Sequence, residues 1–411
     1  MKAGKRDLWT AALFFLCCLF FLWNNQSLYM PKAQREGYGR RLFEMYGERV
    51  PMREKDRSLK KLIAEREKLY NDHLFERLGF AERYGGLQRA LGKRMLDDPK
   101  EDMRVYRGEG ERLFYAIPRR IKAAKLEEMA DSIAAFAGRL EEEGVDFVMV
   151  SAPNRNELLC SYLPKGTADF SRENREGFLS ELAKRGVETL DLQERFAGAE
   201  GDSVFYRTDT HWRNAFALEA AEILAESFPR TLLPQGRKEM YYRERFYPAL
   251  YIGSMGKRSG KYFFDGKDDY TLLLPDEMTS YYYMKTEDPD EREWEKRGSF
   301  EEVFLREEVL DSEDEYIDRY TAMMGYGTAL EYIRNENLSR GKVLMIKDSF
   351  GMPLAAYLST QVHELYLVDL RNAKMKERLW ALIGEKRPEQ VIFLYSPTSL
   401  YYFDEMFDLP S

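Results

Sequence analysis

The sequence predicts an α/β fold in which a mainly parallel sheet is covered by helices on both faces. Two observations support this prediction. Short runs rich in Val, Ile, Leu and Phe follow segments with helical periodicity, and this alternation recurs along the C-terminal part of the chain. Among the 411 residues, 44% are hydrophobic and 33% are charged, which suits a folded chain with a core and excludes disorder or a collagen-like fibre.

The individual elements follow in chain order. A hairpin is predicted at residues 105–106 and 113–115, around a Gly-Glu-Gly turn. Helices are predicted at residues 121–143, 172–185, 329–336 and 374–385, and strands at 145–150, 187–192, 342–346, 363–368 and 390–395. Strands separated by helices of this length favour parallel pairing, and functional residues then gather at the carboxyl ends of the strands.

The N-terminus has the pattern of an export signal. Lys2, Lys5 and Arg6 precede sixteen uncharged residues at positions 8–23. A helix of that length spans about 24 Å, which is slightly short of a bilayer core and leaves a cleaved signal peptide as an alternative. Residues 24–27 (Asn-Asn-Gln-Ser) offer no A-x-A-like cleavage site. We therefore expect residues 1–30 to be a single-pass membrane anchor, with the remainder of the chain outside the cytoplasm.

The rest of the chain divides into two parts that differ in composition and in hydrophobic pattern. Residues 31–103 are densely charged and interrupted by glycines, which favours short amphipathic helices forming a stalk or lid. Residues 104–411 are expected to form the α/β domain, with a Tyr- and Gly-rich insertion at about 235–310. Its aromatic and basic residues could contact an anionic polymer, although most such aromatics serve packing.

Charge and cysteine content exclude several functional classes. The chain has 63 Lys and Arg against 71 Asp and Glu, a net charge of −8, which argues against a nucleic-acid partner. Three cysteines are too few for a disulfide framework or a structural zinc site. Asp265, Asp268 and Asp269 lack the distal glutamate of an EF-hand loop and are interpreted as a turn between two strands. The site described below needs no metal and no organic cofactor.

Only three histidines, His73, His211 and His363, could act as a general base near neutral pH. His73 has no nearby partner pattern and is interpreted as a surface residue. His363 lies at the amino end of a predicted strand, opposite the expected site. His211 is therefore the candidate base.

A serine follows one of the predicted buried strands directly. Residues 347–351 read Lys-Asp-Ser-Phe-Gly and lead into an apolar helix start. At such a strand-to-helix turn, Ser349 can expose its hydroxyl beside backbone N–H groups able to bind an oxyanion. Asp-Ser is also common helix-capping chemistry, so the turn alone does not identify a nucleophile.

A second segment supplies the missing partners. Residues 206–212 read Tyr-Arg-Thr-Asp-Thr-His-Trp and precede an apolar-faced helix. A serine nucleophile needs a base and a carboxylate that orients it, and His211 with Asp209 could provide both. The sequence thus predicts a Ser349, His211 and Asp209 triad.

These two segments, with residues 363–371, resemble the DHHW family, which is similar to the SGNH-hydrolase-like domains of the alginate O-acetylation proteins. The resemblance covers roughly residues 100–400. It implies an SGNH-hydrolase-like fold, with Ser349 as the nucleophile, His211 as the base and Asp209 as its orienting acid. This sequence departs from the pattern at one position. By the resemblance, the broader SGNH group has Gly-Asp-Ser at the nucleophile, and Lys347 stands where that glycine would be.

Four further residues are candidates for oxyanion or substrate contacts. Asn154 and Arg155 follow the strand at 145–151, and would lie at the same sheet edge as Ser349. A turn-forming Pro-Asn pair is the alternative explanation for the asparagine. Tyr206 and Trp212 flank the Asp-Thr-His segment.

The site and compartment together predict an extracytoplasmic O-acetyltransferase that acts on a cell-surface polysaccharide through an acyl-serine. Because acetyl-CoA is cytoplasmic, the resemblance implies a multi-pass membrane acyltransferase as the partner that supplies the acyl group. Two alternatives stay open: a carbohydrate esterase with the same triad, and a noncatalytic polysaccharide-binding or assembly protein.

Overall fold

The computed structural model describes most of the chain beyond residue 76. The described residues are 14–16, 18–19, 77–96, 104–228, 240–286, 293–325 and 330–410. The chain divides into two units, Met1–Tyr84 and Gly85–Ser411. Among the described residues, no helix is long and apolar enough to cross a bilayer. Most of the predicted anchor and stalk, including His73, lies outside the described residues.

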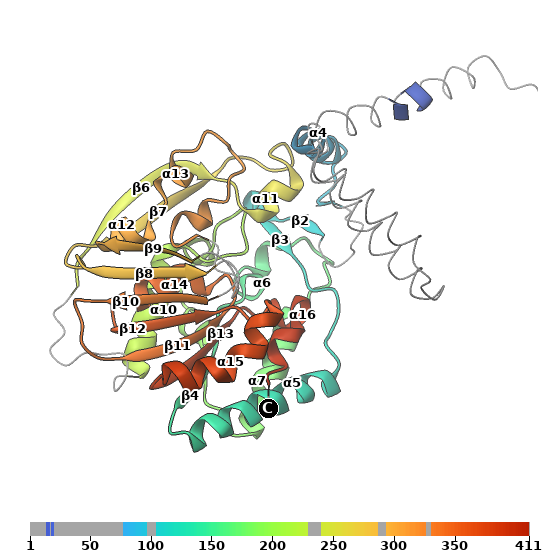
Figure 1. Ribbon diagram of the computed structural model, residues 1–411. Coiled ribbons are helices and arrows are strands. Elements are labelled where there is room, and N and C mark those ends of the chain that lie inside the picture. Colours follow the sequence, from blue (N-terminus) through green and yellow to red (C-terminus); the bar gives the residue numbers. More distant parts are fainter. Residues whose placement is uncertain are drawn as a thin grey trace, which may run out of the picture. The chain divides into compact units, whose positions relative to one another are not determined.

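An eight-stranded sheet forms the centre of the second unit (Figure 1). Its strand order is β5-β4-β13-β11-β12-β10-β8-β9. The parallel strands are β4 (Asp146–Ser151), β5 (Thr189–Asp191), β11 (Lys342–Lys347), β12 (Glu364–Val368) and β13 (Gln390–Tyr395). Three strands extend the sheet in antiparallel fashion: β8 (Tyr281–Thr286), β9 (Glu293–Gly298) and β10 (Leu330–Asn335).

One prediction was wrong. A helix was expected at residues 329–336, but Leu330–Asn335 form strand β10, which pairs with β8 on one side and β12 on the other. Ala, Leu and Glu at positions 329–331 favour a helix locally, but burial alternates residue by residue along the strand. Pairing with two neighbouring strands therefore overrides the local helical preference.

Helices cover both faces of the sheet, as predicted (Figure 1). Strand β11 shows this directly, because Leu344 and Ile346 pack in one hydrophobic cluster while Val343 and Met345 pack in another. The first cluster includes side chains of α5 (Ala123–Glu142), α7 (Ser171–Lys184) and α15 (Ala373–Lys386). The second includes side chains of α10 (Asn214–Ser227) and α14 (Gly351–Leu358), which pack against each other.

Two smaller sheets complete the second unit. The predicted hairpin forms as β2 (Val105–Arg107) and β3 (Leu113–Tyr115), and β1 (Met95–Leu96) pairs with β2. The described part of the insertion predicted at about 235–310 supplies the hairpin of β6 (Tyr242–Tyr251) and β7 (Asp268–Pro275), together with strands β8 and β9 of the main sheet.

The remaining elements are a helix of 14 residues that precedes β1 and short segments that connect these strands and helices. They are α4 (Arg77–Ala90), η2 (Glu109–Glu111), α6 (Arg155–Leu158), η3 (Cys160–Tyr162), α8 (Leu192–Arg195), α9 (Gly201–Val204), α11 (Ser254–Ser259), α12 (Phe300–Phe304), α13 (Glu307–Leu310), η4 (Arg319–Ala322), α16 (Ser399–Tyr402) and η5 (Asp404–Phe407). Helices α6, α14 and α16 begin shortly after the carboxyl ends of β4, β11 and β13, respectively. This edge of the sheet therefore collects the segments that carry the predicted site.

Candidate active site

Ser349 lies in the turn between β11 and α14, at the carboxyl edge of the sheet. The buried carboxylate of Asp348 holds this turn in place. Its Oδ1 accepts a hydrogen bond from the Phe350 backbone N–H (2.9 Å). Its Oδ2 accepts hydrogen bonds from the Ser396 N–H (2.7 Å) and the Ser399 hydroxyl (2.8 Å), which follow β13. Asp348 thus fixes the serine turn to the neighbouring strand end, a role that the sequence analysis did not assign to it.

Lys347, at the position where the SGNH pattern has glycine, lies in the interior of the domain. Its side chain is buried, and its Nζ lies 3.7 Å from Oε1 of the buried Glu331 on β10. A Cβ on Gly351 would lie only 2.6 Å from the Lys347 Cβ. The first turn of α14 therefore needs glycine at this position because it passes directly over the lysine.

His211 connects Ser349 to Asp209. Its Nε2 lies 2.7 Å from the Ser349 Oγ, and its Nδ1 forms a short hydrogen bond with Oδ1 of Asp209. The same carboxylate oxygen accepts the His211 backbone N–H (2.8 Å). With the imidazole proton on Nδ1, Nε2 is free to accept the serine proton. The structure thus brings together the three residues that the sequence predicted, from two segments 138 positions apart.

Both oxygens of the Asp209 carboxylate accept hydrogen bonds. Its Oδ2 accepts the Tyr251 hydroxyl (2.9 Å) and the Ser254 backbone N–H. A Cβ on Gly253 would lie 2.2 Å from the Asp209 Cβ, so only glycine allows the corner after β6 to approach this closely.

The directions in which the pKa values of Asp209 and His211 shift agree with this geometry. Burial alone would raise the pKa of Asp209, but the charge of His211 and the hydrogen bonds hold that pKa well below its usual range. Burial alone would lower the pKa of His211, and the neighbouring charge of Asp209 raises it, with smaller contributions from Asp318 and Asp348. The imidazolium that forms when His211 takes a proton is therefore stabilised in the folded protein.

A second buried carboxylate, Asp268 on β7, shapes the loop that carries Asp209 and His211. It accepts hydrogen bonds from the Arg207 N–H (2.9 Å), the Thr208 N–H (2.9 Å) and the Thr208 hydroxyl (2.6 Å). From the sequence, Asp268 is interpreted only as part of a turn between two strands. Because its partner loop lies 60 positions away in the sequence, no local pattern identifies this role.

Tyr320 stacks on the imidazole of His211. The ring centroids lie 4.0 Å apart with an interplanar angle of 15°. Tyr320 belongs to η4, whose first turn is capped by Asp318, because the Asp318 carboxylate accepts the Tyr320 backbone N–H (3.1 Å). This contact fixes the plane of the imidazole, and nothing in the sequence of residues 311–322 predicts it.

Asn154 caps helix α6 and lines a small pocket beside the serine turn. Its Oδ1 accepts the backbone N–H groups of Asn156 (2.9 Å) and Glu157 (3.2 Å), so the amide orientation is fixed. Its Nδ2 donates to none of the described residues. The pocket has a volume of about 20 Å³ and is lined by Tyr115, Pro153, Asn154, Arg155, Asn156, Thr210, Phe350, Ser396, Pro397 and Thr398.

Three of the candidate contact residues are core residues instead. The buried Arg155 guanidinium donates to the backbone carbonyls of Leu113 (3.0 Å), Tyr206 (2.6 Å) and Arg207 (3.1 Å), which ties β3 to the loop carrying Asp209. The Tyr206 ring is fully buried against other tyrosines, and Trp212 is fully buried against Phe350. These side chains are buried, and their contacts hold the loop that carries Asp209 and His211.

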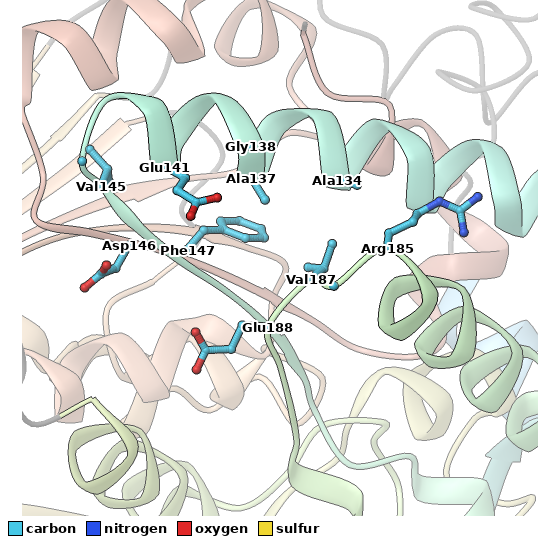
Figure 2. A pocket seen from close by; sticks show the side chains of 12 residues that line it. Ala134, Ala137, Gly138, Glu141, Val145, Asp146, Phe147, Arg185, Val187 and Glu188 are labelled. Carbon is cyan, nitrogen blue, oxygen red and sulfur yellow. The ribbon is translucent and has the colours of Figure 1, made fainter.

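Other candidate positions lie away from the serine. His363 precedes β12 at the amino edge of the sheet, where its Nδ1 is 2.9 Å from the Asn335 carbonyl oxygen. A pocket of about 390 Å³ also lies at the amino ends of β4 and β5 (Figure 2). It is lined by Phe147, Arg185 and carboxylates such as Glu141 and Glu188, and by no serine, cysteine or histidine. Within the described ranges, no group of three or more His, Cys, Asp or Glu residues could hold a metal ion.

Comparison with known proteins finds similar sequences and similar structures. A family model described as "SGNH hydrolase-like domain, acetyltransferase AlgX" matches residues 105–262, which include Asp209 and His211 but end before Ser349. A protein named probable alginate O-acetylase AlgJ, from Pseudomonas syringae pv. tomato, is 27% identical over 131 residues. That match covers 31% of this chain and 34% of the relative, so the chain spans about a third of that relative's length.

Solved structures show the same fold at low sequence identity. Bacillus cereus PatB1, solved with a sulfonyl adduct, superposes with a TM-score of 0.61 and 17% identity over 77% of this chain and 99% of PatB1. A DHHW family protein from Eubacterium siraeum gives a TM-score of 0.55 and 17% identity over 78% of this chain and all of the other. The predicted resemblance is thus confirmed: residues 105–262 are similar to the SGNH hydrolase-like domain of the alginate O-acetylation proteins, and the chain has the fold of this DHHW family protein.

Proposed function

We propose that this protein is a serine-dependent O-acetyltransferase that acts on a cell-surface polysaccharide through an acyl-serine intermediate. One observation carries the proposal: Ser349, His211 and Asp209 form a continuous hydrogen-bonded chain at the carboxyl edge of the sheet. This is the arrangement that activates a serine hydroxyl for attack on an acyl carbonyl. The similarity to a family described as an acetyltransferase, and to a probable alginate O-acetylase, supports acetyl transfer to a polysaccharide.

The first half-reaction places the acetyl group on the enzyme. The Ser349 Oγ attacks the carbonyl carbon of the acetyl donor while His211 Nε2 takes the hydroxyl proton. The tetrahedral intermediate then collapses, the bond between the carbonyl carbon and the leaving group breaks, and His211 gives its proton to that leaving group. Asp209 keeps the imidazole in the required tautomer and stabilises its positive charge.

The second half-reaction transfers the acetyl group to the acceptor. A sugar hydroxyl gives its proton to His211 Nε2 as its oxygen attacks the acetyl-serine carbonyl. Collapse of this second intermediate breaks the bond to Oγ, and Ser349 regains the proton from His211. The cycle uses only these side chains and consumes no further reactant.

The developing oxyanion has two candidate donors. No described residue accepts a hydrogen bond from the Ser349 backbone N–H. The Nδ2 of Asn154 is held in a fixed orientation by the cap of α6 and borders the pocket beside Phe350. Pre-oriented donors of this kind lower the barrier because they need no rearrangement when charge develops.

Location and donor supply complete the proposal. The basic residues before the apolar segment 8–23 support a single-pass anchor that places the domain outside the cytoplasm. An acetyl group made in the cytoplasm must then cross the membrane. A multi-pass membrane acyltransferase is the partner we propose for that step.

The discriminating experiment follows the fate of the acetyl group. The protein is incubated with p-nitrophenyl acetate, with and without an acceptor oligosaccharide, and free acetate and acetylated sugar are both quantified. We expect acetylated sugar to form at the expense of acetate, and both to be lost in Ser349→Ala. Acetate alone would identify an esterase. Polysaccharide binding without either product would identify the noncatalytic alternative.

A further inference from the structure

A buried ion pair lies next to the turn that carries Ser349. Lys347, the last residue of β11, has a side chain that is 1% exposed, and its Nζ lies 3.7 Å from Oε1 of Glu331 on β10, whose side chain is 2% exposed. The contact spans β12, which lies between these two strands. Because desolvation of two charges opposes their attraction, such a pair adds little to stability by itself. Its role therefore lies in what it connects.

The lysine side chain supports the serine turn. It follows Val343 and Met345 on the face of β11 that packs against α10 and α14. A Cβ built on Gly351 would lie 2.6, 3.2 and 2.8 Å from the Cβ, Cγ and Cδ atoms of Lys347. The first turn of α14 thus rests on the lysine stem. Ser349 lies between these two residues in the chain, so the position of the lysine constrains that of the serine.

Glu331 continues the connection to the segment that holds the base. Its carboxylate accepts a hydrogen bond from the Tyr283 hydroxyl of β8, and this hydroxyl lies 3.4 Å from the Met324 carbonyl oxygen. Met324 comes two residues after η4, which carries Tyr320, and Tyr320 stacks on the imidazole of His211. Buried polar contacts therefore run from the serine turn to the residue that fixes the plane of the base.

We propose that Lys347 is a positioning residue for the triad. Through Glu331 and Tyr283, it holds the serine turn and the η4 segment at the spacing at which Ser349 meets His211. This inference rests on the proposed function, because it concerns activation of the same serine. The Ser349 Oγ lies 2.7 Å from His211 Nε2. A displacement of about 1 Å at such a contact can slow a reaction by about 10²-fold.

The test measures the reactivity of Ser349 without an acceptor sugar. Phenylmethylsulfonyl fluoride is the probe: its sulfur forms a bond to the serine Oγ, fluoride leaves, and His211 takes the serine proton. Intact-protein mass spectrometry gives the rate of modification, and digestion confirms that Ser349 carries the adduct. With p-nitrophenyl acetate, kcat and KM are measured beside it.

The informative change is Lys347→Met/Glu331→Gln. It removes both charges together, and the glutamine carbonyl can still accept the Tyr283 hydroxyl. We expect sulfonylation and kcat to fall by about ten- to a hundredfold, with KM little changed, because positioning acts on the transition state. Thermal unfolding should show a folded protein, since a buried ion pair can be replaced by neutral residues at little cost.

Two further variants separate positioning from general packing. Lys285 of β8 lies opposite Glu331 in the antiparallel register and is 7% exposed, so it faces the same carboxylate. Lys285→Met removes a buried charge of the same kind at two strands' distance from β12, and should leave the sulfonylation rate unchanged. Lys347→Arg keeps the charge on a similar stem and should recover part of the rate that Lys347→Met loses.

Two results would overturn the positioning role alone: a folded double variant that reacts at the wild-type rate, and an equal loss of rate in Lys285→Met. A wild-type Ser349 that the probe does not modify would overturn both this role and the proposed function. Sulfonylation that is slowed in the double variant, without acetyl transfer to sugar by the wild type, would remove the proposed function but not the positioning role.

Discussion

At the scale of single residues, the site depends on how the second carboxylate oxygen of Asp209 is occupied. Tyr251 and Ser254 satisfy Oδ2, which leaves Oδ1 for the imidazole and the His211 backbone. Sequence spacing predicted the three reacting side chains because each belongs to a recognisable segment. It could not predict Tyr251, Asp268 or Tyr320, because each contacts the site from a segment with no catalytic pattern of its own.

Asp209→Asn should lower kcat for acetate release from p-nitrophenyl acetate by about 10³- to 10⁴-fold. The amide keeps the shape of the carboxylate, but it favours the wrong imidazole tautomer and gives no charge to stabilise the imidazolium. The matched control is Asp131→Asn, which removes an exposed carboxylate that, among the described residues, binds Arg185 alone. A loss of less than tenfold for Asp209→Asn would contradict the assigned role.

The pH dependence of the reaction should report on the charges around His211. Activity needs neutral imidazole, so kcat/KM should rise with pH through the pKa of His211, which Asp209 raises against the effect of burial. The other facing charges are Asp318 and Asp348. Asp318→Asn removes one negative charge, so the pKa of His211 should fall and the rising limb should move to lower pH. A rising limb that is unchanged or moves to higher pH would show that Asp318 does not act on the imidazole.

At the scale of elements, the site is assembled by close contacts between loops from different strands. The corner between β6 and α11 approaches Asp209 so closely that Gly253 has no room for a side chain. The alternation of helix and strand predicted most elements correctly because their apolar faces are regular. It failed at β10, where Leu330 and Glu331 prefer a helix but the segment is paired as a strand with β12 and β8.

Gly253→Ala should destabilise the fold by about 1–3 kcal/mol and reduce ester turnover together, because the added methyl group displaces Asp209. Gly138→Ala is the matched control. Gly138 lies within α5, and its added Cβ would meet no atom within 4 Å, so alanine there should stabilise the protein by about 0.5–1 kcal/mol. Urea unfolding measures both. Equal effects of the two substitutions would show that the approach to Asp209 is not critical.

At the scale of the whole molecule, every residue assigned to the site belongs to the unit Gly85–Ser411. The family model matches only residues 105–262. The position of the carboxyl-terminal part, which carries Ser349, is therefore known from the structure and not from that match. The parallel sheet brings these parts together, because its strand order places β4, β13, β11 and β12 side by side. The sequence predicted this class of sheet, but not its antiparallel extension through β10, β8 and β9.

A chain comprising residues 85–411 should therefore fold and hydrolyse p-nitrophenyl acetate at the rate of the full chain. All the hydrogen bonds of the triad and its supporting carboxylates lie within this unit. Thermal unfolding and acetate release are measured on both proteins. A shorter chain that unfolds cooperatively but has lost turnover would show that the first unit contributes to the reaction.

The central claim is that Ser349 carries the acyl group, and intact-protein mass spectrometry tests it most directly. The protein is exposed briefly to p-nitrophenyl acetate, quenched in acid, and digested to locate any adduct. The account predicts a mass increase of one acetyl group on Ser349, lost in Ser349→Ala and discharged faster when an acceptor sugar is present. No adduct, or the same adduct in Ser349→Ala, would contradict it.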